Sequence, residues 1–125
     1  MSQPANPVHW FEIPVLDMDR AKAFYESVFE IELQVTQMAT SLMAFFPMIQ
    51  GSPGSPGSLT KEEGYTPSYD GSVVYFLVDD INAALGRADE KGGKTLVPKM
   101  SIGEHGFIAH LADTEGNRIA LYAMT

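Results

Sequence analysis

Trp10-Phe-Glu-Ile-Pro-Val-Leu-Asp17, followed by Met-Asp-Arg-Ala-Lys-Ala, returns in similar form 63 residues later. The second copy is Val73-Val-Tyr-Phe-Leu-Val-Asp-Asp80, followed by Ile-Asn-Ala-Ala-Leu-Gly. Each copy places an apolar strand before an aspartate that can cap the first turn of an amphipathic helix. An internal repeat of this kind indicates one structural unit used twice, with a groove where the copies meet.

Each copy begins a module with the order β-α-β-β-β. Further strands are predicted, from apolar and β-branched content between turn signals, at residues 32–38, 41–48, 95–98, 106–111 and 118–124. A fourth strand of the first module is expected near Leu59, where the pattern is weaker. We therefore expect one α+β domain over residues 1–125. In it, two tandem βαβββ modules form an incomplete, barrel-like mixed sheet around a groove.

A low-complexity segment, Gln50-Gly-Ser-Pro-Gly-Ser-Pro-Gly-Ser58, lies between the two copies. Gly, Ser and Pro favour neither a strand ladder nor a helix, so residues 50–71 are expected to form a flexible loop. Module one then covers about residues 6–60, and module two covers about residues 72–125. A loop of this length in a small domain serves either as a lid over a site or as a plain linker.

Composition excludes several classes of function. The chain has 16 acidic and 8 basic residues, a net charge of −8, which argues against nucleic acid and anionic membranes as partners. Cysteine is absent, so disulfides, thiolate nucleophiles and cysteine-based zinc sites are excluded. Residues 1–7 have neither the basic nor the apolar part of a signal peptide, and no apolar stretch is long enough to span a bilayer. A cytoplasmic location is therefore expected.

Four phrases add to the repeated strand-Asp-helix pattern. They are His9-Trp-Phe-Glu-Ile-Pro14, Val78-Asp-Asp-Ile81, Ile102-Gly-Glu-His-Gly-Phe-Ile-Ala109 and Asp113-Thr-Glu-Gly-Asn117. In this order they resemble the vicinal oxygen chelate superfamily, and in particular its small bacterial glyoxalase-like proteins. That superfamily includes glyoxalase I, extradiol dioxygenases, fosfomycin-resistance enzymes and bleomycin-resistance proteins. The resemblance covers nearly the whole chain except the Gly/Ser/Pro run, and it implies the two-module fold, a small organic ligand and a homodimer.

Enzymes of this superfamily bind a divalent metal through His or Glu side chains on the concave face of the sheet. Counting back seven residues from the capping aspartates puts two of these positions at Trp10 and Val73. Counting three residues past Gly-Asn puts the usual glutamate at Ala120. None of these side chains can ligate a metal, and a shift of one residue recovers only His9. No cofactor is predicted, and an atypical divalent-metal site is the alternative.

Aromatic residues are expected to line the groove. Alternation along the strands puts Trp10 and Glu12 on one face, and Tyr75 and Tyr122 share it. Aromatic walls with polar tips suit a planar or amphipathic small molecule, although a packed interior is the alternative interpretation. His110 falls in the middle of a predicted strand, and the sequence leaves its face open.

Two residues are candidates for acid–base chemistry. Burial of Glu12 in an apolar groove would disfavour its ionised form, so that it can serve as a general base or as an anchor for a cationic ligand. The alternative for Glu12 is an exposed or structurally bonded carboxylate. His105 precedes a predicted strand at the groove rim, where it is either an acid or base or a solvated loop histidine.

The expected function is metal-independent binding of a small organic molecule, as in the bleomycin-resistance-type proteins that sequester a ligand without chemistry. The predicted lining residues are Trp10, Glu12, Tyr75, His110 and Tyr122. The alternative is a lyase or isomerase acting on a small carbonyl compound, with Glu12 or His105 as base. A third interpretation is an accessory domain whose groove contacts another protein.

Overall fold

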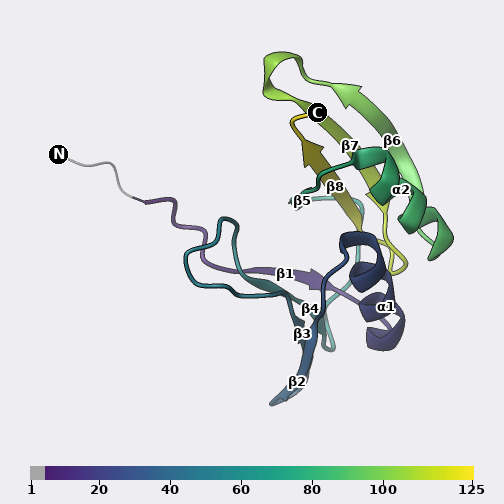
Figure 1. The fold of residues 1–125 in the computed structure, drawn as a ribbon. Helices are drawn as coiled ribbons and strands as arrows, with labels where there is room; N and C mark the ends of the chain where they lie inside the picture. The colour runs from purple at the N-terminus through teal and green to yellow at the C-terminus, as the bar shows by residue number, and fades with distance from the viewer. Residues whose placement is uncertain (1–4) are drawn as a thin grey trace.

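The computed structural model describes residues 5–125, so the first four residues of the segment compared with a signal peptide lie outside it. Module one contains β1 (Phe11–Pro14), α1 (Met18–Phe29), β2 (Gln34–Met38), β3 (Ser41–Phe45) and β4 (Gly57–Lys61). Module two contains β5 (Tyr75–Leu77), α2 (Ile81–Glu90), β6 (Lys94–Ser101), the 3-10 turn η1 (Gly103–His105), β7 (Phe107–Ala112) and β8 (Arg118–Ala123). Figure 1 shows this repeated order of elements, which confirms the predicted α+β fold with two βαβββ modules.

Each module forms its own four-stranded mixed sheet. The strand orders are β1-β4-β3-β2 and β5-β8-β7-β6, and in each sheet the first strand runs parallel to its neighbour while the other pairs are antiparallel. The strands therefore form two separate sheets instead of the single barrel-like sheet that was expected. Within the described residues, side-chain packing, not strand hydrogen bonding, joins the two sheets. The rings of Phe11 and Phe76, for example, meet edge-on with centroids 6.3 Å apart.

The aspartates of the repeat cap the two helices as predicted. The Asp17 carboxylate accepts a hydrogen bond from the amide of Arg20, and Asp80 accepts one from the amide of Ala83, each over 3.0 Å. Each bond satisfies a donor that the first helical turn leaves free. The two copies of the sequence motif therefore fix the points where α1 and α2 begin.

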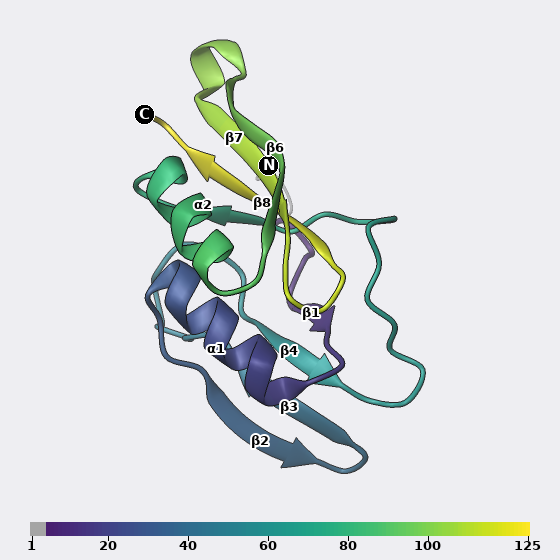
Figure 2. The same ribbon diagram turned by 90° about the vertical axis from the view of Figure 1, so that its right-hand side faces the viewer.

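Both helices lie side by side and cover the two sheets from the same side of the molecule (Figures 1 and 2). Their apolar stripes join one core that both modules share, with Tyr25, Val28, Ile81 and Ala84 all fully buried. Burying these stripes accounts for most of the stability that either helix can have, since short helices are marginal alone. Among the described residues, neither helix is long and apolar enough to cross a membrane.

The prediction of a flexible loop over residues 50–71 is wrong at residues 57–61. These residues form β4, the fourth strand expected near Leu59, and β4 lies in the sheet between β1 and β3. Ser58 and Leu59 are fully buried. Gly57 belongs to the Gly/Ser/Pro run for a packing reason, because a Cβ atom there would stand 2.3 Å from the ring of Phe11. Low complexity in this segment thus reflects close packing as well as turns.

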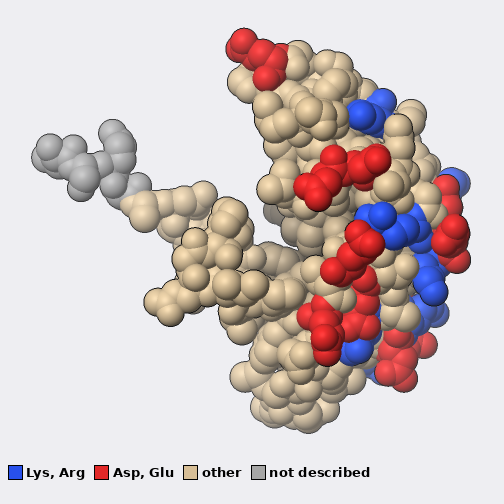
Figure 3. Space-filling view, viewed as in Figure 1, with Lys and Arg blue, Asp and Glu red and all other residues tan. Residues whose placement is uncertain are grey.

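Charged side chains are distributed unevenly over the surface. In Figure 3 most of the Asp, Glu, Lys and Arg side chains visible from this side lie over the two helices. The part of the surface formed by the sheets carries few of them in this view. On this face, therefore, the charged side chains gather over the helices.

Candidate functional site

Each sheet has one face against the helices and an opposite face, which we call the inner face. On β8, Leu121 is fully buried in the common core, so its neighbours Ala120 and Tyr122 point to the inner face. Tyr75 of β5 and His110 of β7 pair with Ala120 from its two sides. Both therefore share the inner face, which answers the question that the sequence left open for His110.

A chain of three polar side chains crosses this face. The Tyr75 hydroxyl lies 3.0 Å from Nε2 of His110, and Nη1 of Arg118 lies 2.9 Å from Nδ1 of the same ring. A guanidinium can only donate, so Nδ1 accepts and the hydrogen of the neutral ring is on Nε2. Nε2 then donates to the Tyr75 oxygen, and the hydroxyl hydrogen of Tyr75 remains free to donate to a ligand.

The surroundings of His110 favour this neutral state. Burial lowers the pKa of His110 below its ordinary value of 6.5, and the positive charge of Arg118 lowers it further. The imidazole is therefore neutral at pH 7, and Arg118 fixes its tautomer. Tyr75 itself is 49% exposed, so a ligand can reach the hydroxyl.

The small side chain of Ala120 makes this chain of contacts feasible. Ala120 is fully buried although it faces away from the helices. The rings of Tyr75 and His110 meet edge-on over it, with centroids 5.6 Å apart. A glutamate at position 120 would compete for the space in which these two rings meet. Ala120, which stands where a metal-binding glutamate was expected, thus leaves room for the contact between Tyr75 and His110.

The predicted residues of module one lie apart from this group. Glu12 is exposed, and its carboxylate accepts a hydrogen bond from the Tyr65 hydroxyl over 3.0 Å, which raises the pKa of Tyr65. Trp10 packs edge-on against Phe45, with centroids 5.7 Å apart. Glu12 is therefore placed as an accessible carboxylate, and the burial expected for a base in an apolar groove is not found.

Of the remaining candidates, Tyr122 and His105 lie together toward the far end of β8. The Tyr122 hydroxyl donates to the backbone carbonyl of His105 and lies 2.8 Å from the sulfur of Met124. Its hydrogen is thereby used within the protein. The imidazole of His105 is exposed in η1, and His9 is exposed before β1. A catalytic role for Glu12 or His105 remains a prediction.

Two hollows show how the predicted residues are grouped. A pocket of about 140 Å³ between the modules has Glu12 and Arg118 in its wall, together with polar residues of the segment after β4. A cavity of about 540 Å³ lies at the module junction and includes Tyr75, but none of Trp10, Glu12, His110 or Tyr122. The structure thus groups Tyr75, His110 and Arg118, and does not gather all predicted residues in one enclosed pocket.

The donor set does not fit the divalent metal that the resemblance implies. Among residues 5–125, no group of three or more His, Asp or Glu side chains is arranged to hold a metal ion. The three expected positions hold Trp10, Val73 and Ala120, which have no donor for a metal.

The sequence marked residues 113–117 only as one of the phrases that carry the resemblance, but their side chains join the two modules. Asn117 donates from Nδ2 to the carbonyl of Pro14 over 2.8 Å, and the buried Tyr25 hydroxyl donates to Asp113 over 2.6 Å. Glu115 accepts from the amides of Leu16 and Asp17, at 2.8 and 2.9 Å, and from the guanidinium of Arg20 at 2.7 and 3.0 Å. We call the side chains of Asp113, Glu115 and Asn117 the clasp.

Glu115 is the charged centre of the clasp, and its side chain is fully buried. Burial alone would raise the pKa of Glu115. Hydrogen bonds from Arg20, from the amides of Asp17 and Leu16 and from Thr114 outweigh it and lower this pKa from 4.5 to about 2. The available signal was that four of the five residues in this turn are polar, more than a solvated turn requires.

Comparisons with known proteins agree with this geometry. A sequence model of the Glyoxalase/Bleomycin resistance protein/Dioxygenase superfamily matches residues 8–121. The chain therefore belongs to this superfamily.

Individual relatives show the same relationship. A glyoxylase-like domain-containing protein of Didymella fabae is 31% identical over 119 residues, which are 88% of each chain. The protein CFP32 of Mycobacterium bovis is 27% identical over 127 residues, which cover 91% of this chain but only 44% of CFP32. A crystal structure of a glyoxylase/bleomycin resistance protein/dioxygenase domain from Frankia sp. EAN1pec aligns over 98% of this chain and all of its own, with a TM-score of 0.74 at 16% identity. That similarity shows the fold alone.

Proposed function

We propose that the protein binds a small organic molecule on its inner face without the superfamily's metal, in the manner of bleomycin-resistance-type binding proteins. The observation that carries this proposal is the chain from Arg118 through His110 to Tyr75. It orients a free hydroxyl hydrogen toward solvent at an exposed position. A fixed donor of this kind gives a ligand carbonyl or hydroxyl a preferred orientation.

Apolar surface beside this donor supports the proposal. Leu77 and Met100 share the inner face by strand register, and they are 72% and 46% exposed. Large exposed apolar side chains close to a few oriented polar groups are typical of binding surfaces. Flexible methionine suits ligands of irregular shape. Trp10 and Tyr122 remain proposed as further aromatic residues of the groove.

A homodimer is part of the proposal, because one chain leaves the inner face open. Among the described residues, β1 pairs only with β4 and β5 pairs only with β8, so each has one free edge. A second copy set against these edges would supply the missing wall of the groove. Light scattering on purified protein tests this: a mass near twice 13.7 kDa supports the dimer, and a monomer at micromolar concentration contradicts it.

The binding test begins with a thermal-shift screen of untagged protein. The panel contains small carbonyl compounds, planar aromatics and a bleomycin-type glycopeptide. Titration calorimetry with the best compound then compares Tyr75→Phe with Tyr69→Phe, an exposed tyrosine in the segment after β4. Loss of the Tyr75 donor is expected to weaken binding by about 1 kcal/mol, roughly fivefold, and the control substitution should not. Equal affinities of the two variants would contradict the proposal for this face.

Elemental analysis of the same untagged protein tests the metal-independent part separately. The expected result is no stoichiometric metal and no stabilisation by zinc, nickel, manganese or iron. One tightly held metal per chain would contradict the proposal. It would place His9, Glu12, His105 and His110 first among candidate ligands. A cytoplasmic location also remains a prediction, which fractionation of the native host would check.

A further inference from the structure

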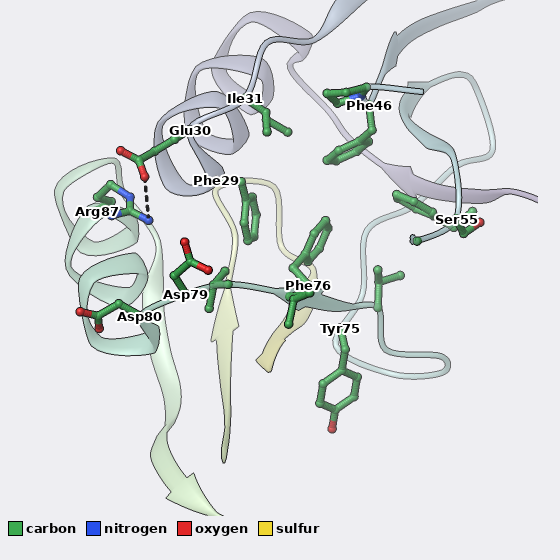
Figure 4. A pocket seen from close by; sticks show the side chains of 16 residues that line it. Phe29, Glu30, Ile31, Phe46, Ser55, Tyr75, Phe76, Asp79, Asp80 and Arg87 are labelled. Atoms are coloured by element: carbon green, nitrogen blue, oxygen red, sulfur yellow. Dashed lines mark ion pairs between the residues drawn. The ribbon is translucent and has the colours of Figure 1, made fainter. Parts of the chain in front are cut away.

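The 540 Å³ cavity lies on the other side of β5, between the modules and beside the helices. Its volume is within the usual range for small-molecule sites. Its walls come from the end of α1, the residues after β3, the segment at 54–55, β5 and α2 (Figure 4). Side chains alternate along β5, so Phe76 points to this cavity side while the inner-face donor Tyr75 points away from it. The cavity and the inner-face site thus share strand β5, whose residues Tyr75 and Leu77 border the cavity, but the Tyr75 ring lies on the opposite side (Figure 4).

Four phenylalanines form one aromatic wall of this cavity. Phe29 and Phe76 stack with centroids 4.3 Å apart and an interplanar angle of 26°, and Phe46 lies 5.7 Å from Phe76. Phe11 completes the group, 5.2 Å from Phe46. Three rings come from module one and one from module two, so the wall exists only when the modules are assembled. Phe46 is buried, whereas Phe11, Phe29 and Phe76 are partly exposed, and partly exposed ring surface can accept an apolar body or a cation.

The charged residues at the rim are mostly acidic. Glu30, Asp79 and Asp80 face the single cation Arg87, which gives the rim a net charge of −2. Arg87 is already engaged: Nε donates to the carbonyl of Val28 over 2.9 Å, and Nη2 lies 3.8 Å from Glu30. Its charge is therefore not free to hold an anion.

Asp79 is the carboxylate left available at this rim. Asp80 is occupied as the cap of α2, whereas Asp79 is exposed and has no hydrogen bond or ion pair to its side chain within residues 5–125. Figure 4 shows Asp79 between Arg87 and the rings of Phe29 and Phe76. A ligand that touches the aromatic wall thus lies within reach of an uncompensated negative charge.

We propose that this cavity binds an organic cation, such as an amine or a quaternary ammonium compound with an aromatic or branched apolar body. The apolar body packs on Phe29 and Phe76, and the cationic group lies at the rim beside Asp79. The Asp79 carboxylate attracts the cationic group while the rings hold the apolar body, and an anion would meet a rim of net charge −2. This site is independent of the inner-face site, so failure of either proposal leaves the other untouched.

The test uses the full chain and three probes of similar size. Benzyltrimethylammonium is the cation, neopentylbenzene is its neutral isostere and benzoate is the anion. Nuclear magnetic resonance titrations should show saturable shifts of the Phe29 and Phe76 signals with the cation. The isostere should bind about fivefold more weakly, and benzoate should not saturate. Equal binding of the cation and its isostere would refute the proposal.

Two isosteric variants separate a local charge from the net charge of the protein. Asp79→Asn should weaken binding of benzyltrimethylammonium by about fivefold. Asp89→Asn removes the same charge from an exposed position on α2 outside the cavity and should leave the affinity unchanged. Equal effects of the two substitutions, or shifts confined to inner-face signals, would overturn the proposal. Both positions are exposed, so neither variant is expected to unfold.

Discussion

Replacing Glu115 by glutamine removes the charge of the clasp and keeps nearly the same shape. The wild-type carboxylate accepts from two backbone amides and from the Arg20 guanidinium. A glutamine offers one oxygen and turns an NH₂ group toward donors on its other side. The two modules are therefore expected to lose part of their mutual stabilisation, because buried donors are left without an acceptor.

The shifted pKa of Glu115 sets the size of this effect. A fall from 4.5 to about 2 corresponds to about 3 kcal/mol of folding free energy, at about 1.4 kcal/mol per pKa unit. Because the pKa is lower in the folded state, this contribution is complete above about pH 5 and is lost as the pH falls from 4.5 toward 2. At pH 3 about 1.4 kcal/mol of it remains.

Urea unfolding at pH 7 and pH 3 measures this difference between wild type and Glu115→Gln. The variant should be less stable by about 3 kcal/mol at pH 7 and by roughly half that at pH 3. Glu90→Gln, at an exposed position that ends α2, is the matched control and should change little at either pH. A difference between wild type and Glu115→Gln of less than about 1 kcal/mol at pH 7, or one that does not shrink at pH 3, would refute the reasoning.

Two further predictions test packing and the inner face. Gly57→Ala should destabilise the protein by about 1–3 kcal/mol in urea unfolding, because the new Cβ would overlap the ring of Phe11. Gly86→Ala, on an exposed face of α2 with no atom within 4 Å of the added Cβ, should instead stabilise it by about 0.5–1 kcal/mol; the same sign for both would contradict the packing argument. Arg118→Met should raise the pKa of His110 toward 6.5 in a proton resonance titration, and an unchanged midpoint would show that Arg118 does not influence the ring.

Local patterns were sufficient to predict the modules, and the reason is visible in the repeat. Strand alternation, a capping aspartate and an apolar helical stripe each act over a few residues, so one copy of the motif defines one strand-helix unit. The structure confirms Asp17 and Asp80 as caps. Residues 57–61 were misjudged because Gly57 reads as a loop signal unless the position of Phe11 is known.

The site was less predictable, because it depends on contacts between distant residues. Alternation placed Tyr75 on the inner face, but the partner of its hydroxyl comes from β7, 35 residues away. The role of Arg118 follows from the tautomer of His110, which no sequence pattern encodes. The clasp was missed for the same reason, since Glu115 meets residues almost one hundred positions earlier in the chain.

Because of the clasp, the segment that connects the two modules is not the main interaction holding them together. Side chains of residues 113–117 and a shared core hold the two modules together. In the connecting segment, by contrast, a Cβ atom added at Gly64 would have no other atom within 4 Å. A chain opened at the peptide bond before Gly64 is therefore expected to stay assembled. Fragments 1–63 and 64–125, produced separately, should recombine into the native fold. Their failure to associate would show that the covalent connection is needed to hold the two modules together. In its architecture the protein is an intramolecular pair of complementary halves, which makes it a natural scaffold for split-protein reporters.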